Sequence, residues 1–164
     1  MITLRPATIA DLDLVQYWDT KQHVIDCDPD DDGWVWAQEL VRNPEWREQL
    51  IAELNGEPLG FIQIIDPYLE ETHYWGPIAP HKRAIDIWIG EEHHLNKGYG
   101  TRMMELAIAK CFSDKSVDSI LIDPLKTNTK AQTFYKRLGF QFVEERDFGG
   151  TTCMVYELKR DKPA

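Results

Sequence analysis

Asp86 is a carboxylate in an otherwise apolar segment, the stretch from 84 to 89 that reads AIDIWI. The alternating pattern predicts a β-strand whose isoleucines share one face, so that Asp86 and Trp88 share the other. A carboxylate that faces a cleft can take a proton from a bound group. The alternative is a strand residue that faces solvent, and the residue types alone leave both interpretations open.

Gly98 and Gly100 follow this strand after a short polar loop, and a long helical pattern begins directly behind them. Glycine lets the backbone approach a bulky anion, and the N–H groups at a helix start attract negative charge. Lys97 and Arg102 add positive charge at the same place. Neither the third glycine of a Rossmann site nor the Lys-Ser or Lys-Thr pair of a Walker site is present. The spacing therefore predicts a strand-to-helix junction that binds phosphate.

Two further acidic positions lie where a cleft beside this junction is expected. Asp123 precedes Pro124 at the end of a predicted strand, where the residue types by themselves indicate a strand stop. Glu70 and Glu71 lie in the irregular segment 66–83, which is rich in polar and aromatic residues. Loops of this length in compact domains are usually functional or disordered, and the aromatic content argues against disorder.

A run of five aspartates between 26 and 32 precedes Trp34 and Trp36. The run predicts a solvated loop because like charges repel. The two tryptophans either line a substrate cleft or fill the core. No metal site is predicted, because the run lacks the closing glutamate of a calcium loop and His93-His94 lack further ligands.

These candidates require a scaffold of alternating strands and helices. Apolar periodicity and turn signals predict strands at 2–5, 49–54, 58–65, 84–89, 119–122, 141–148 and 152–159, and helices at 9–20, 34–42, 100–112 and 128–138. Asn55-Gly56 and Gly149-Gly150 predict hairpins. The order implies an α/β (α+β) fold with a mixed sheet and helices on its faces. The strands at 84–89 and 119–122 should be parallel neighbours, since a crossover helix joins them.

The composition narrows the function classes. The length of 164 residues predicts a single domain over 1–164, and the net charge of -10 argues against a nucleic-acid partner. An acidic surface is either plain solvation or an acidic cleft that attracts a small cationic substrate. No membrane span or signal peptide is predicted, and three widely spaced cysteines fit no disulfide framework. We therefore expect a cytoplasmic protein.

Two segments together resemble the acetyl-CoA-binding core of the GCN5-related N-acetyltransferases (GNAT). One is the strand, loop and glycine junction of 84–101; the other is the later helix with Asn128 near its start and the run from Tyr135 to Phe140. The first position of the glycine loop departs from the family pattern, because Leu95 stands where Gln or Arg is usual. The resemblance implies the GNAT fold, with a mixed central sheet of about six to seven strands, and acetyl-CoA as co-substrate.

Within that superfamily the chain is similar to the aminoglycoside 6'-N-acetyltransferase branch. The matching pieces include 54–60, 85–86, 97–101 and Asp123-Pro124. The residues from 23 to 83 match less well, and the same branch contains acyltransferases of hydroxylysine-type siderophore precursors. The resemblance implies direct acetyl transfer to a primary amine in a ternary complex, with the 6'-amine of an aminoglycoside as the leading acceptor. A small endogenous amine or hydroxylysine derivative, and a non-catalytic acyl-CoA-binding domain, remain as alternatives.

The resemblance also implies roles for individual residues. Asp86 would act as the base, directly or through water, and Tyr135 would protonate the departing thiolate; the backbone N–H of Trp88 or Ile89 would stabilise the oxyanion. The acetyl-CoA site would comprise Ile87, Trp88, Ile89, Lys97, Gly98, Tyr99, Gly100, Thr101, Arg102, Asn128, Ala131, Tyr135 and Lys136. The acceptor site would comprise Trp34, Glu70, Glu71, Asp86 and Asp123. A monomer and a homodimer that pairs an exposed strand 152–159 both fit.

Overall fold

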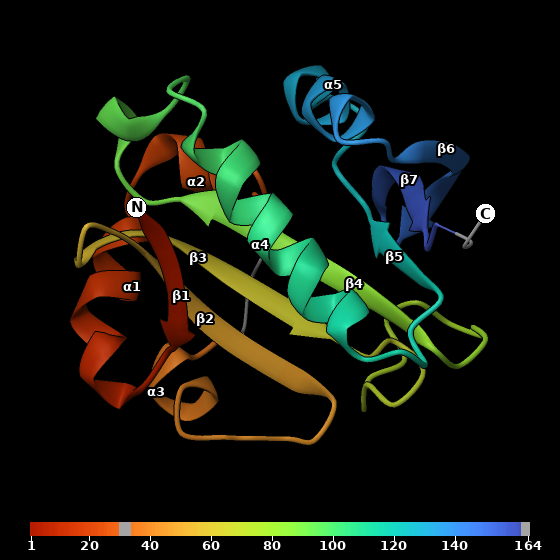
Figure 1. The fold of residues 1–164 in the computed structure, drawn as a ribbon, viewed down its shortest axis with the longest axis horizontal. Coiled ribbons are helices and arrows are strands. Elements are labelled where there is room, and N and C mark those ends of the chain that lie inside the picture. The colour runs from red at the N-terminus through yellow and green to blue at the C-terminus, as the bar shows by residue number, and fades with distance from the viewer. Residues whose placement is uncertain (30–33, 162–164) are drawn as a thin grey trace.

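One seven-stranded sheet organises the chain in the computed structural model, which describes residues 1–29 and 34–161 (Figure 1). The strands are β1 (Ile2–Pro6), β2 (Arg47–Leu54), β3 (Glu57–Ile65), β4 (Lys82–Ile89), β5 (Ser119–Ile122), β6 (Gln141–Phe148) and β7 (Thr151–Lys159). The helices are η1 (Ile9–Asp11), α1 (Leu12–Trp18), α2 (Gln22–Ile25), α3 (Trp36–Glu39), η2 (Glu92–His94), α4 (Tyr99–Ser113) and α5 (Thr129–Arg137). The predicted mixed sheet and all seven strands are confirmed.

The sheet order is β1-β2-β3-β4-β5-β7-β6. Every neighbouring pair is antiparallel except β4 and β5, which are parallel as predicted from the crossover helix between them. The predicted exposure of strand 152–159 is wrong, because β7 lies between β5 and β6. The free edge at this end belongs to β6, which is irregular near Phe142 and Glu144. Such bulges, together with edge charges, protect an edge against pairing with another chain.

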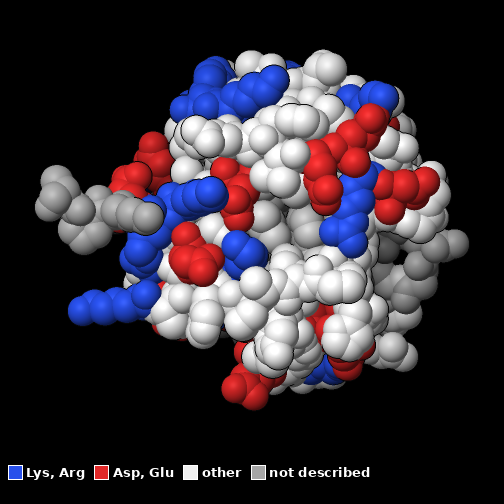
Figure 2. Space-filling model, turned by 90° about the vertical axis from the view of Figure 1, so that its right-hand side faces the viewer, with Lys and Arg blue, Asp and Glu red and all other residues white. Residues whose placement is uncertain are grey.

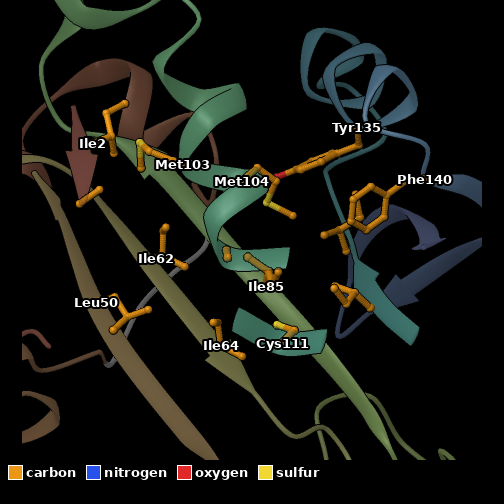
Figure 3. Close-up of a cluster of buried hydrophobic side chains, with 14 of the residues drawn as sticks. Ile2, Leu50, Ile62, Ile64, Ile85, Met103, Met104, Cys111, Tyr135 and Phe140 are labelled. Carbon is orange, nitrogen blue, oxygen red and sulfur yellow. The ribbon is translucent and has the colours of Figure 1, made fainter. Parts of the chain in front are cut away.

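The two faces of the sheet carry different packing. Alternation along β3 and β4 sends Ile62, Ile64 and Ile85 to the face covered by α4, where Met103 and Met104 are fully buried (Figure 3). The opposite face carries a second cluster, formed by Val15, Trp18, Trp36, Leu40, Ile51 and Phe61. Asp86 and Trp88 lie on this second face, as the alternation predicted. Their side chains are therefore on the side of the sheet that α1 and α3 cover, not on the side that α4 covers.

The N-terminal helices are shorter and more broken than the periodicity predicted. The helix expected at 9–20 is a 3-10 turn followed by α1, and Thr8 and Asp11 form a capping box at its start. The helix expected at 34–42 is the single turn α3, and α2 was not predicted. Short helices of this kind draw their stability from tertiary packing instead of local propensity, so periodicity detects them poorly. The aspartates at 30, 31 and 32 lie outside the described residues.

The two predicted hairpin turns are confirmed. Asn55 and Gly56 both have positive φ, as do Gly149 and Gly150. Asn128 caps α5 by accepting a hydrogen bond from the Ala131 N–H at 3.0 Å. Among the described residues, no helix is both long and apolar enough to span a membrane. Basic and acidic side chains are interspersed on the face shown in Figure 2 instead of gathering into one basic patch.

Gly90 is a residue whose replacement should strongly disturb this packing. A Cβ built on it would lie 2.0 Å from the Cε2 atom of Trp18, which is 1% exposed. We expect Gly90→Ala to cost about 1 to 3 kcal/mol of unfolding free energy and several degrees of Tm. Thermal melting checks this result. Gly100→Ala is the matched control, because its added Cβ would meet nothing closer than 3.7 Å; an unchanged Tm in Gly90→Ala would contradict the packing.

Candidate acyl-transfer site

The site lies where β4 and β5 separate. The two strands pair only through Lys82–Ala84 and Ser119–Leu121, and the remainder of β4 continues without a strand on that side (Figure 1). Beyond this point Asp123 and α5 lie across a gap from the second half of β4. We call this opening between the strands the seam. The sequence predicted parallel neighbours but not the early end of their pairing.

The backbone of β4 faces the seam through alternate residues. Gly90 donates its N–H to the Leu59 carbonyl at 3.0 Å, so the polar groups of Gly90 point toward β3. Because backbone groups alternate sides along a strand, those of Trp88 also point toward β3, while those of Ile87 and Ile89 point into the seam. Of the two N–H groups expected to hold an oxyanion, the geometry therefore favours Ile89 over Trp88.

A cavity of about 740 Å³ opens beside the seam, on the sheet face opposite α4. Its wall includes eight of the predicted site residues: Trp34, Glu70, Asp86, Ile87, Trp88, Asp123, Asn128 and Tyr135. Trp36 also lines it, so the tryptophan pair is partly buried and still borders the cavity. Glu71 does not line the cavity; it forms a 2.6 Å ion pair with Arg42 on the surface.

The predicted phosphate junction lies outside the cavity, at the start of α4. Gly98 is the N-cap residue, with a left-handed φ of 82°, so glycine is favoured there. Gly100 lies between the ends of β4 and α5, with Ile89 and Phe134 side-chain atoms 3.7 Å from where its Cβ would be. This leaves the first-turn N–H groups of a 15-residue helix beside the seam. The residues present fit a phosphate-containing donor whose reactive end reaches the seam.

The other predicted donor-site residues lie in or next to α4 and α5. Lys97 is exposed before Gly98, and Arg102 makes an exposed contact with Glu105 at 3.4 Å. Ala131 is in the first turn of α5, and Lys136 lies over the Tyr156 ring at 5.9 Å. Tyr99 contacts the ring of His94, and Thr101 follows in α4.

Tyr135 reaches from α5 toward α4 and the seam (Figure 3). It is 9% exposed and packs against Phe134 and Phe140. Burial, and after it the negative charge of Asp86, raises the pKa of the Tyr135 hydroxyl above its ordinary value. The phenol therefore stays protonated throughout the neutral range and can donate its proton.

Asp123 is held by a residue that the sequence did not single out. The Tyr74 hydroxyl donates to Asp123 Oδ2 at 2.6 Å, and the Tyr74 ring stacks on Phe148 at 4.6 Å. Burial of the carboxyl group, and after it the charge of Asp86, raises the pKa of Asp123 to about 7. The only sequence signal for Tyr74 was its place in the aromatic-rich loop between β3 and β4.

The charge of the cavity wall is strongly negative. Five carboxylates line it: Asp19, Asp28, Glu70, Asp86 and Asp123. Arg47 is the one lysine or arginine among the described lining residues, and its guanidinium is already bound to Glu39 at 2.6 Å with 3% of the side chain exposed. The wall can therefore bind cations, but it has no unpaired lysine or arginine among its described residues to bind a carboxylate of a ligand.

Comparisons with known proteins agree with this geometry. A family model described as an acetyltransferase (GNAT) domain matches residues 8–148. The aminoglycoside N(6')-acetyltransferase type 1 of Klebsiella pneumoniae is 28% identical over 156 residues, which is 85% of this chain and 74% of that protein. The lysine N-acyltransferase MbtK of a Mycobacterium species (strain MCS) is 25% identical over 96% of this chain and 66% of its own length.

Solved structures give the same result. The crystal structure of aminoglycoside acetyltransferase AAC(6')-Ib in complex with coenzyme A and kanamycin superposes with a TM-score of 0.88 at 27% identity, covering 98% of this chain and 95% of that one. The complex with ribostamycin and coenzyme A has a TM-score of 0.87 at 26% identity over 97% and 93% of the two chains. The predicted family, fold and enzyme class are confirmed: the chain belongs to the GNAT acetyltransferase family and is an N-acetyltransferase.

Proposed function

We propose that this N-acetyltransferase transfers the acetyl group of acetyl-CoA to a primary amine of a polycationic acceptor, with the 6'-amine of an aminoglycoside as the leading acceptor class. The observation that carries the choice of acceptor is the cavity wall, with five carboxylates and an Arg47 already neutralised by Glu39. An amine of this kind has a pKa near 10 and arrives as an ammonium ion, which such a wall attracts.

Transfer needs a base, because an ammonium ion has no lone pair with which to attack a thioester. Asp86 is exposed to the cavity, and Gln63 donates to its Oδ2 atom at 3.4 Å. It first takes one proton from the ammonium ion, directly or through water, and the neutral amine then attacks the thioester carbon. The Ile89 N–H points into the seam and stabilises the negative charge that forms on the carbonyl oxygen. Tyr135 then donates its proton to the thiolate as the C–S bond breaks, and the second proton that the nitrogen loses as the amide forms restores the phenol.

The cysteines in the cavity wall support direct transfer over a covalent acyl-enzyme. Burial raises the pKa of Cys153 to about 12, and burial also raises the pKa of Cys27. Both thiols are therefore protonated near neutral pH and are poor nucleophiles. All three cysteines of the chain are free, which also supports the cytoplasm as the proposed compartment.

A lysine-type acceptor is the second candidate, favoured by the similarity to the lysine N-acyltransferase MbtK. A free amino acid of this kind brings its own carboxylate. Leaving the negative charge of that carboxylate unpaired in an acidic cavity is costly. Among the described lining residues only Arg47 carries a full positive charge, and Arg47 is already paired with Glu39. The wall therefore supports acceptors that carry several amines and no acid.

Thiol release from acetyl-CoA across a matched panel of amines tests the proposal. The panel contains aminoglycosides that differ only by a 6'-amine or a 6'-hydroxyl group, together with lysine and hydroxylysine. We expect release with the 6'-amines, none with their 6'-hydroxyl partners, and weak release with the amino acids. Turnover confined to lysine-type amines would replace the acceptor, and no release with any amine would refute the transfer itself.

The raised pKa of Asp123 predicts a pH dependence of acceptor binding. The carboxyl group is ionised above about 7 and neutral below it, so it loses its attraction for an ammonium ion as the pH falls. We expect the acceptor KM to rise below pH 7, by at most about tenfold per pH unit, and to level off above it. Asp123→Asn keeps an oxygen for the Tyr74 hydroxyl and should have a high KM with no such dependence. Steady-state kinetics across this range decide the point, and an unaltered KM profile in the variant would exclude Asp123.

A further inference from the structure

His23 makes a long-range contact that the mechanism above does not use. Its Nε2 atom lies 2.8 Å from the carbonyl oxygen of Ile89, which is 66 residues away in the sequence. Because a carbonyl oxygen can only accept, the imidazole must carry its proton on Nε2 and donate it. His23 is in α2, whereas Ile89 is the last residue of β4.

The position of this carbonyl gives the contact its significance. The N–H and C=O of one strand residue point to the same side, so the carbonyl held by His23 and the N–H that faces the seam both belong to Ile89. Fixing the carbonyl fixes the orientation of this residue at the end of a strand that has no β5 partner there. The hydrogen bond therefore holds the group proposed to stabilise the oxyanion.

The other end of the contact belongs to the acceptor side of the cavity. Val24 and Ile25 of α2, and Cys27, Asp28 and Pro29 after it, line the cavity. We call residues 24–29 the acceptor wall. The His23 hydrogen bond and an ion pair between Lys21 and Glu91 at 3.5 Å dock the start of α2 on the end of β4 and the loop that follows.

We propose that His23 is a positioning residue, which aligns the acceptor wall with the Ile89 oxyanion donor by hydrogen bonding to the Ile89 carbonyl. The inference rests on the proposed function, because His23 would align the acceptor side and the donor side of that same site. Small misplacements of a bound nucleophile relative to its electrophile reduce rates strongly, and the His23 hydrogen bond is the docking contact that reaches the Ile89 backbone itself.

Two substitutions of similar size separate this role from simple packing. His23→Phe keeps a planar ring but removes the donor, while His23→Gln places an amide N–H close to the position of Nε2. We expect His23→Phe to lower kcat/KM for the acceptor about tenfold or more. His23→Gln should stay within about threefold of the parent, and coenzyme A affinity measured by calorimetry should change less than twofold in both. Lys21→Ala is the control: it removes the partly exposed ion pair with Glu91 and an exposed hydrogen bond to the Tyr17 hydroxyl, neither of which touches the Ile89 carbonyl, and it should be nearly neutral.

A second measurement does not depend on turnover. Hydrogen exchange should quicken in residues 21–29 and 89–91 of His23→Phe, and should remain at the parent rate in His23→Gln. Equal losses of kcat/KM in both variants, or a His23→Phe variant with unchanged kcat/KM and exchange, would overturn the inference. Failure of every amine to release thiol while exchange responds as expected would refute the proposed function and leave the contact between α2 and β4 established.

Discussion

Tyr135→Phe is expected to lower kcat by roughly 10²-fold or more while leaving the affinity for acetyl-CoA nearly unchanged. The substitution removes one oxygen atom from a side chain that lines the cavity and is 9% exposed, so the ring packing against Phe134 and Phe140 is retained. Without the hydroxyl group, the thiolate must leave unprotonated or collect a proton from water.

The measurement is a comparison of kcat with the calorimetric Kd for the donor. Tyr68→Phe is the control, because Tyr68 is 51% exposed in the loop after β3 and does not line the cavity. An unchanged kcat in Tyr135→Phe would remove Tyr135 as the acid. A parallel loss of donor affinity would show instead that the hydroxyl group serves binding.

Asp86→Asn is the second change with a large expected effect, a loss of about 10²- to 10⁴-fold in kcat. The amide has nearly the same shape as the carboxylate but cannot take a proton from the attacking ammonium. In the parent enzyme, activity should fall as the pH decreases and Asp86 becomes protonated. In the variant this acidic limb of the kcat profile should be absent or displaced, because the group that titrates has been removed.

The pH–rate profile of kcat distinguishes this role from general electrostatics. Asp13→Asn is the control, since it removes the same charge from an exposed position of α1 outside the cavity. A superimposable profile for Asp86→Asn would exclude Asp86 as the base. Because the charge of Asp86 also raises the pKa of Asp123, the variant should shift the KM profile set by Asp123 to lower pH.

Local sequence signals predicted the structural elements that we propose to bind the donor. The strand alternation at 84–89 placed Asp86 and Trp88 on one face. The glycine at position 98 indicated the start of α4, because the N-cap residue there has a left-handed φ that favours glycine. Asn128, which the sequence placed near the start of a helix, caps α5. Each of these features depends on residues within one turn or one strand, which is the range over which periodicity and capping rules operate.

The acceptor half could not be predicted in the same way, because tertiary contacts create it. Tyr74 reaches Asp123 across 49 residues, and His23 reaches Ile89 across 66. The single turn α3 and the short helix α2 have no periodicity to detect. The tryptophans at 34 and 36 were assigned to a cleft or to the core, and the structure places them in both.

The early separation of β4 from β5 has a consequence for what this molecule can bind. It places a sheet edge inside the protein, with the polar backbone groups of Ile87 and the N–H of Ile89 turned toward the seam instead of toward another strand, while the Ile89 carbonyl is bound by His23. Water molecules satisfy such an edge without forming a regular ladder, whereas an extended molecule with alternating amide donors and acceptors can pair with it as an eighth strand would. Selection of the donor then depends on main-chain hydrogen bonds, which side-chain substitutions leave in place, so the acceptor wall can vary while the donor stays the same.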